Sequence, residues 1–185
     1  MRGNSVAKGI KSIVFGGGCF WCTQAVFDML NGVVKTTPGY AGGHTKNPTY
    51  EQVCSGETGH AEVIKVEYDT GVTDLIKLME VFFASHDPKS VNKQGADIGS
   101  QYRSIILYTD ENDRKIIENY MKSIAGNFKK PIVTEVKKLD AFYPSEDYHK
   151  DYYRLNPLQP YCMLVIRPKM RKISKEFGPM LKQAE

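Results

Sequence analysis

The stretch VFGGGCFWCTQAVFDML, residues 14–30, joins a strand-like run to a helix-like run through three glycines. The apolar residues before the glycines predict a buried strand over residues 10–16. Apolar residues at helical spacing after them predict a helix over residues 19–31. Two cysteines therefore stand where a strand turns into a helix, with Phe20 and Trp21 between them.

The chain downstream continues the pattern. Alternating apolar residues and turn signals predict further strands over residues 33–41, 61–69 and 103–109, and a helix capped by Thr73 that ends before residue 86. The resulting order β-α-β-β-α-β is that of the split βαβ unit of ferredoxin-like folds. We therefore expect an α+β fold, with an antiparallel-rich sheet carrying helices on one face.

Additional elements are expected after this unit. The sequence predicts a further helix from Asp110, a strand over residues 131–139, and a C-terminal loop and helix. A chain of 185 residues with 41% hydrophobic and 25% charged residues is typical of one domain with a full core. We therefore treat residues 1–185 as a single domain.

Charge and hydropathy bear on partners and location. The net charge of +4 resides in residues 165–185, and we interpret this segment as a solvated helix. No motif that reads nucleic acid accompanies it. No apolar run is long enough to span a bilayer, and the N-terminus lacks the apolar core of a leader. We expect a cytoplasmic monomer without nucleic-acid or membrane partners.

The four cysteines are too few for a disulfide scaffold. Cys19 opens a helix, where unpaired backbone N–H groups favour a thiolate, so its pKa is predicted to fall and its reactivity to rise. The C-x-x-C spacing with Cys22 indicates a redox pair. One alternative is a zinc-stabilised module using all four cysteines, although Cys54 and Cys162 are isolated rather than paired.

Polar side chains that suit the same site lie further along the chain. Glu62 enters a strand among apolar neighbours, and desolvation there would raise its pKa and make it a general acid. The alternative is a solvated glutamate at a strand end. Tyr50, Asp97 and Tyr102 lie in two irregular stretches, and a phenol can hold a polar oxygen in an apolar pocket.

Two adjacent aromatic residues at a helix start face different directions, so at least one of Phe20 and Trp21 should line a surface pocket. An apolar pocket beside a reactive sulfur would hold an apolar group of a substrate.

Several motifs, taken together, resemble peptide methionine sulfoxide reductase type A. They are GGGCFWC, GYAGG, PTYEQVCSGETGHAEVIKVEYD, HDP and GADIGSQYRSIIL, and the likeness runs from about residue 10 to about residue 170. The family reduces the S-epimer of methionine sulfoxide, free or in proteins. It generally takes electrons from thioredoxin and requires no metal or organic cofactor.

The resemblance implies roles for particular residues. Cys19 attacks the sulfoxide sulfur, and Glu62 donates a proton to the sulfoxide oxygen. Phe20 and Trp21 form the pocket for the substrate methyl group.

Tyr50 and Tyr102 correspond to the tyrosines that bind the oxygen, and Asp97 corresponds to the acidic residue of the loop before Tyr102. Cys19 then carries a sulfenic acid, which a second thiol converts to a disulfide.

The identity of that second thiol stays open. Many members have glycine where this chain has Cys22, and many resolve through a cysteine in a C-terminal tail that this chain lacks. We favour Cys22. Cys162 is the alternative, either on a proline-flanked loop that swings inward or as an inert residue in a packed strand over residues 161–166.

Two further positions are left open. Gln24 stands where many members have glutamate, and His149 belongs either to a network around the site or to a polar surface loop. The rival function is a general thiol–disulfide oxidoreductase that uses Cys19 and Cys22 without a sulfoxide pocket.

Overall fold

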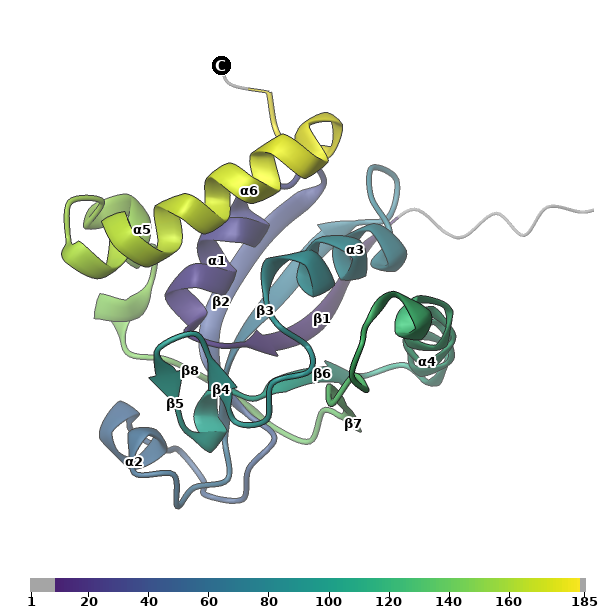
Figure 1. Cartoon of the computed structure of the whole chain (residues 1–185). Coiled ribbons are helices and arrows are strands. Elements are labelled where there is room, and N and C mark those ends of the chain that lie inside the picture. The colour runs from purple at the N-terminus through teal and green to yellow at the C-terminus, as the bar shows by residue number, and fades with distance from the viewer. Residues whose placement is uncertain (1–8, 184–185) are drawn as a thin grey trace, which may run out of the picture.

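The computed structural model describes residues 9–183 (Figure 1). Residues 1–8, on which part of the single-domain expectation and the expectation about a leader fall, lie outside the described residues, as do residues 184–185. None of the helices within residues 9–183 is both long and apolar enough to cross a membrane.

A six-stranded sheet forms the centre of the fold. Its order is β7-β6-β1-β3-β2-β8, and every neighbouring pair is antiparallel except β6 and β7. The strands are β1 (Ile10–Gly17), β2 (Val33–Ala41), β3 (Ala61–Asp69), β6 (Ser104–Tyr108), β7 (Glu135–Lys138) and β8 (Phe142–Pro144). The inner four follow the split βαβ order, so the expected ferredoxin-like α+β core is confirmed.

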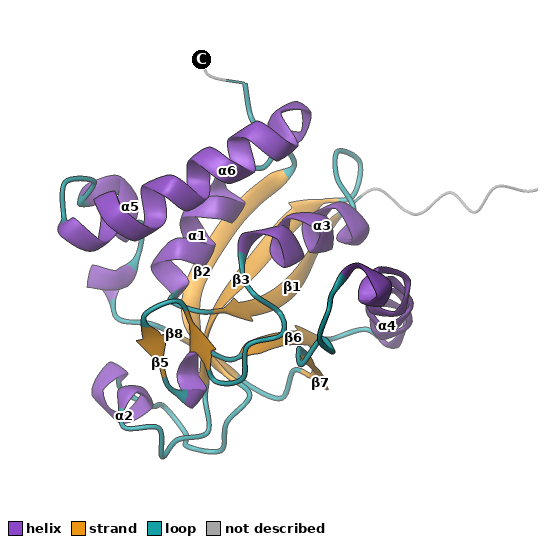
Figure 2. Ribbon diagram, in the orientation of Figure 1, coloured by secondary structure: helices purple, strands orange, loops and turns teal. Residues whose placement is uncertain are grey.

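Two helices, α1 (Phe20–Asp28) and α3 (Leu75–Ser85), pack on one face of this sheet. A third helix, α6 (Arg167–Phe177), lies across them as an outer layer (Figure 2). Phe15 of β1 stacks on Phe27 of α1, with ring centroids 5.0 Å apart, and on Phe82 of α3, at 4.7 Å. The alternation in β1 turns Phe15 toward these helices and Val14 toward the small apolar cluster on the opposite face.

Shorter elements surround this core. α4 (Glu111–Ile124) begins after Asp110, whose side chain accepts a hydrogen bond from the backbone N of Asn112 at 2.8 Å. The others, in chain order, are α2 (Tyr50–Cys54), β4 (Lys93–Gln94), β5 (Asp97–Ile98), η1 (Ser100–Tyr102), η2 (Ala125–Asn127), η3 (Asp147–His149), α5 (Tyr152–Leu155), η4 (Cys162–Ile166) and η5 (Gly178–Met180).

Several boundaries differ from the sequence expectation. The cap of α3 is Asp74, whose carboxylate accepts from the backbone N of Lys77 at 2.9 Å, and not Thr73. The predicted long loop contains α2, which Thr49 and Gln52 cap reciprocally. The expected strand over residues 131–139 shortens to β7.

Residues 161–166, for which a packed strand was one expectation, are helical. Cys162 and Ile166 are buried one turn apart, while Leu164 between them is 76% exposed. In a strand, Cys162, Leu164 and Ile166 would lie on the same face and be buried together. The apolar sequence of this segment therefore predicts the wrong secondary structure.

The loop before β3 is held by close backbone contact at Gly43. The backbone N of Gly43 donates to Nδ1 of His60 at 3.1 Å, and the His60 ring contacts the carbonyl oxygen of Thr45 at 2.7 Å. A Cβ on Gly43 would overlap the backbone of Thr58 and His60. This contact fixes the approach of the chain to β3.

We predict that Gly43→Ala lowers the free energy of unfolding by about 1–3 kcal/mol, because backbone atoms cannot rotate away as a side chain can. Chemical denaturation measures the change. Gly126→Ala is the control, since nothing lies within 4 Å of its added Cβ. Equal stability of the two variants would contradict the close contact.

Candidate active site

The turn from β1 into α1 places Cys19 at the helix entrance. Gly18 adopts a φ of 102°, which favours glycine, and Cys19 then serves as the N-cap residue of α1. The thiol makes no capping hydrogen bond and is half-buried. It is therefore held at the end of the helix without being tied to the backbone.

Glu62 lies at the same helix entrance. Its side chain is 1% exposed, and Oε2 accepts a hydrogen bond from the backbone N of Phe20 at 3.0 Å. Burial raises its pKa to about 8, against the opposing effect of this hydrogen bond. The expectation of a desolvated carboxyl group holds, and the solvated alternative is wrong.

The thiol pair does not follow the sequence expectation. Burial, a hydrogen bond with Cys22 and the charge of Glu62 raise the pKa of Cys19 well above its ordinary value. The hydrogen bond from Cys19 lowers the pKa of Cys22 to about 7, with burial opposing it and the Lys169 charge assisting it. The predicted fall at Cys19 is wrong because burial disfavours the thiolate, and the hydrogen bond with Cys22 and the Glu62 charge add to this effect.

The two aromatic residues after Cys19 face different directions, as expected. Phe20 is 1% exposed and packs in the main core, with its ring centroid 5.8 Å from that of Tyr40. Trp21 is half-buried and stacks in parallel on Tyr152, with ring centroids 3.7 Å apart. Its Nε1–H donates to Nδ1 of His149 at 3.0 Å.

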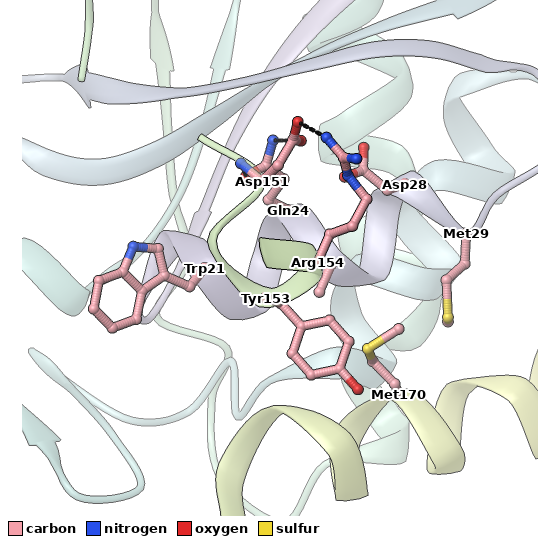
Figure 3. A pocket seen from close by; sticks show the side chains of 9 residues that line it. Trp21, Gln24, Asp28, Met29, Asp151, Tyr153, Arg154 and Met170 are labelled. Carbon is pink, nitrogen blue, oxygen red and sulfur yellow. Dashed lines mark hydrogen bonds and ion pairs between the residues drawn. The ribbon is translucent and has the colours of Figure 1, made fainter. Parts of the chain in front are cut away.

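Trp21 also borders a surface pocket of about 260 Å³ on the far side of α1 (Figure 3). The wall is mostly apolar and includes Ala25, Met29 and Met170, and Arg154 pairs with Asp151 at its rim. Neither Cys19 nor Glu62 lines it. The surface pocket that was expected beside Phe20 or Trp21 is therefore present, but it does not open onto Cys19 or Glu62.

A second cavity, of about 300 Å³, opens onto the thiols. It is lined by Gly18, Cys19, Cys22, Ser85, His86, Asp87, Gln94, Gly95, Ala96, Asp97, Tyr161, Val165 and Lys169. Tyr161 spans its interior, since its hydroxyl donates to Asp97 at 2.6 Å and lies 3.7 Å from Sγ of Cys22. Asp97 is thereby directed toward the thiol pair.

The two candidate phenols lie near Glu62. Burial raises the pKa of Tyr50, at the start of α2, and a hydrogen bond with Cys54 and the Glu62 charge raise it further. Burial and then the Glu62 charge raise the pKa of Tyr102 in η1. Both groups therefore remain phenols at neutral pH and can donate hydrogen bonds.

The remaining thiols differ in setting. Cys22 is 2% exposed and packs in one cluster with Cys162, which is fully buried. Cys162 begins the helical turn η4 and is not on a swinging loop. Cys54 is exposed at the end of α2. Within residues 9–183 no three His, Cys, Asp or Glu side chains gather as metal ligands, which leaves the zinc alternative without a site.

Three residues of the site region were not found from the sequence. Tyr161 and Lys169 line the thiol cavity, and Glu146 binds the backbone of Tyr50. His149, whose role was left open, contacts Trp21. His149 is 1% exposed, so the surface-loop alternative is wrong. No periodicity or spacing marks these residues, because they reach the site through long-range packing.

The hydrogen bonds of Gln24 explain why this chain has glutamine where many members of the family have glutamate. Its amide oxygen accepts from the backbone N of Asp151 at 3.0 Å, and its amide nitrogen donates to Thr36 at 3.1 Å and to the Asp151 carboxylate at 3.3 Å. A carboxylate could not donate to either partner.

A buried carboxylic acid beside two hydrogen-bonded thiols places the chain among thiol-dependent oxidoreductases. The model of the family "Peptide methionine sulfoxide reductase" matches residues 11–180. Peptide methionine sulfoxide reductase MsrA of Sulfolobus acidocaldarius is 52% identical, over 88% of this chain and 92% of that protein. The Saccharolobus solfataricus enzyme of the same name is 48% identical, over 90% and 94%.

Solved structures agree. Reduced Mxr1 from Saccharomyces cerevisiae has a TM-score of 0.79 and 34% identity, over 83% of this chain and 89% of that one. Methionine sulfoxide reductase A of Corynebacterium diphtheriae has a TM-score of 0.72 and 34% identity, over 85% and 79%. The chain therefore belongs to the peptide methionine sulfoxide reductase family, type A. Its reaction is the reduction of methionine sulfoxide.

We predict that Cys19→Ala raises the pH at which the first thiolate appears, from about 7 in the parent protein, because Cys22 loses the hydrogen bond that lowers its pKa most. Ultraviolet absorbance of the thiolate measures this transition. Cys54→Ala is the control and should leave it in place, because that thiol is exposed and distant from the pair in the sequence. An unchanged transition in Cys19→Ala would disprove the coupling.

Proposed function

We propose that Cys19 reduces the S-epimer of methionine sulfoxide, free or in proteins, with Glu62 as the proton donor. The observation that supports this most directly is the hydrogen bond between Glu62 and the backbone N of Phe20. It places an acid with a pKa of about 8 beside the residue that carries the attacking sulfur. A sulfoxide oxygen leaves poorly until it is protonated, so the acid and the thiolate must act together.

The first step begins with a proton transfer between the two thiols. The Cys22 thiolate takes the proton of Cys19, and the Cys19 thiolate attacks the sulfoxide sulfur while Glu62 protonates the oxygen. Tyr50 and Tyr102 donate hydrogen bonds where negative charge develops on that oxygen. In this proposal the methyl group lies against Trp21, which is half-buried and shares an apolar cluster with Cys19, while the buried Phe20 supports this wall from the core. Asp97 orders the cavity through Tyr161. The bond between the methionine sulfur and the protonated oxygen then breaks, and the hydroxyl group is transferred to the sulfur of Cys19. Methionine leaves with the electron pair, and Cys19 carries a sulfenic acid.

Cys22 resolves the sulfenic acid in this proposal. Its sulfur attacks the sulfur of Cys19, a disulfide forms, and the hydroxyl leaves as water with the proton from Cys22. The mutual influence of the two thiols on their pKa values and their spacing of three residues at the start of α1 support this choice. Cys162, which packs against Cys22, is the alternative resolving thiol.

An external dithiol then restores the pair, and a thioredoxin-like protein is the expected donor. Yeast Mxr1 has been solved in complex with Trx2, although this chain's likeness to that structure is at the level of the fold. Thiols supply both electrons, so the proposed cycle needs no metal or organic cofactor. The single domain over residues 1–185, the monomeric state, the cytoplasmic location and the absence of nucleic-acid and membrane partners stay predictions.

The general thiol–disulfide oxidoreductase uses the same two thiols but needs no sulfoxide pocket. Reduction of methionine sulfoxide, compared with reduction of an insulin-like disulfide, separates the two activities.

We predict that Glu62→Gln lowers the single-turnover rate of methionine release by about 10²–10⁴-fold, because an amide cannot supply the proton. In the parent enzyme this rate should rise with pH as the thiol pair ionises near pH 7. It should then fall as Glu62 loses its proton near pH 8. The variant should lack the alkaline fall.

Glu67→Gln, on the same strand, is the matched control and should retain the rate. A rate for Glu62→Gln within about threefold of the parent would remove Glu62 from the acid role.

We also predict that Cys162→Ser still forms a disulfide between Cys19 and Cys22 after one turnover. Cys22→Ser should instead accumulate the Cys19 sulfenic acid, because its remaining buried thiol lacks a direct hydrogen bond to Cys19. Mass spectrometry of peptides from the oxidised proteins identifies both species. A disulfide between Cys19 and Cys162 in the parent enzyme would overturn our choice of Cys22.

A further inference from the structure

His149 lies in a cage of aromatic rings between α1 and α2. Its side chain is 1% exposed. The imidazole centroid is 4.9 Å from that of Phe20 and 5.7 Å from that of Trp21 on α1, and 4.5 Å from that of Tyr50 on α2. Tyr148 closes the cage at 4.1 Å. One side chain therefore touches Trp21 and Tyr50, which have proposed substrate contacts, and Phe20, which supports Trp21 from the core.

The hydrogen bond from Trp21 fixes the tautomer of this imidazole. An indole N–H can only donate, so Nδ1 of His149, 3.0 Å away, must be the unprotonated nitrogen. The ring proton is then on Nε2. This nitrogen is buried and has no hydrogen-bond partner among residues 9–183. A buried donor without a partner is costly, so it requires an explanation.

Glu146 is the group that faces Nε2. Its Oε2 lies 3.9 Å from this nitrogen, and a shift of about 1 Å would bring the pair to hydrogen-bond distance. The same Oε2 accepts from the hydroxyl of Tyr40 at 2.7 Å, and Oε1 accepts from the backbone N of Tyr50 at 2.9 Å. Glu146 therefore anchors the first residue of α2.

We propose that His149 and Glu146 are positioning residues that hold Trp21 and Tyr50 in one fixed relation. His149 orients the indole through Nδ1, and Glu146 orients the phenol through the backbone of Tyr50. The short segment over residues 146–149 thus joins the wall for the methyl group to a donor for the sulfoxide oxygen. This inference rests on the proposed roles of Trp21 and Tyr50.

The two positioning residues should affect different kinetic constants. Trp21 contacts the methyl group in both the bound substrate and the transition state, so loss of His149 should mainly raise KM. Tyr50 acts where charge develops, so loss of Glu146 should mainly lower kcat. In Glu146→Gln one oxygen must serve both Tyr40 and Tyr50, because the amide nitrogen cannot accept a hydrogen bond.

Trp21 is the only tryptophan of the chain, so its fluorescence reports on this hydrogen bond directly. We expect His149→Ala to shift the emission to longer wavelength and to increase quenching by acrylamide, because the indole N–H turns to water. We expect kcat/KM for free methionine sulfoxide to fall about 10–100-fold, mainly through KM.

His149→Asn is the decisive comparison, because its amide oxygen can replace Nδ1 as the acceptor. It should bring fluorescence and KM to within about threefold of the parent values. His44→Asn is the control, since this histidine is exposed and is not one of the rings that contact His149. Thermal unfolding of each variant measures stability separately.

Acidification gives an independent readout. Protonation turns Nδ1 into a donor and breaks its bond with Trp21. Burial lowers the pKa of His149 from its ordinary value of 6.5, and the charges of Glu146 and Glu51 oppose this, while Tyr50 and Tyr148 face the ring as neutral phenols. The parent fluorescence should therefore change below pH 6.5, and His149→Asn should lack that change.

Two results would overturn the inference. One is unchanged fluorescence and unchanged KM in His149→Ala. The other is equal impairment of His149→Ala and His149→Asn, which would reduce His149 to a packing role. If His149→Ala fails to fold, His149→Asn and the acid transition decide the matter. Failure of the proposed chemistry appears separately, as full activity of Glu62→Gln with the fluorescence changes intact.

Discussion

The hydrogen bond from the backbone N of Phe20 to Glu62 is the interaction on which the site depends. It gives the first amide of α1 a partner and fixes this helix to β3 at the point where Cys19 begins it. Burial raises the pKa of the carboxyl group, so the group keeps its proton near neutrality. A structural bond that completes a helix end therefore also places an acid beside a sulfur.

This bond redistributes charge between the two thiols. The helix entrance is where a thiolate is normally stabilised, but Glu62 already uses its first amide and repels a charge on Cys19. Cys22, one turn further, has its pKa lowered instead, by its bond with Cys19 and then by Lys169. The first negative charge of the pair therefore lies on the sulfur of Cys22, next to Cys19. In the proposed mechanism, one proton passes from Cys19 to Cys22 before Cys19 attacks the substrate.

The C-terminal third of the chain completes the site that the N-terminal core begins. From β8 onward it wraps around α1 and returns as α6 across α1 and α3 (Figure 1). This path delivers Glu146 and His149 to one side of Trp21, and Tyr161 and Lys169 to the thiol cavity. Gln24 ties the same segment to α1 through Asp151. The arrangement explains why catalytic geometry depends on residues more than a hundred positions from Cys19.

The sequence by itself determined the split βαβ core. The periodicities of strands and helices are local features of the sequence. The apolar faces of β1, α1 and α3 that they define are buried by packing against one another. It indicated a desolvated Glu62 but left a solvated glutamate open, and burial in the fold decided between the two. Only the tertiary structure decided which thiol is the more acidic, because that depends first on the burial of Cys19 and on its hydrogen bond with Cys22. It alone decided that residues 161–166 are helical and that His149 is buried, since both follow from packing against α1 rather than from local pattern.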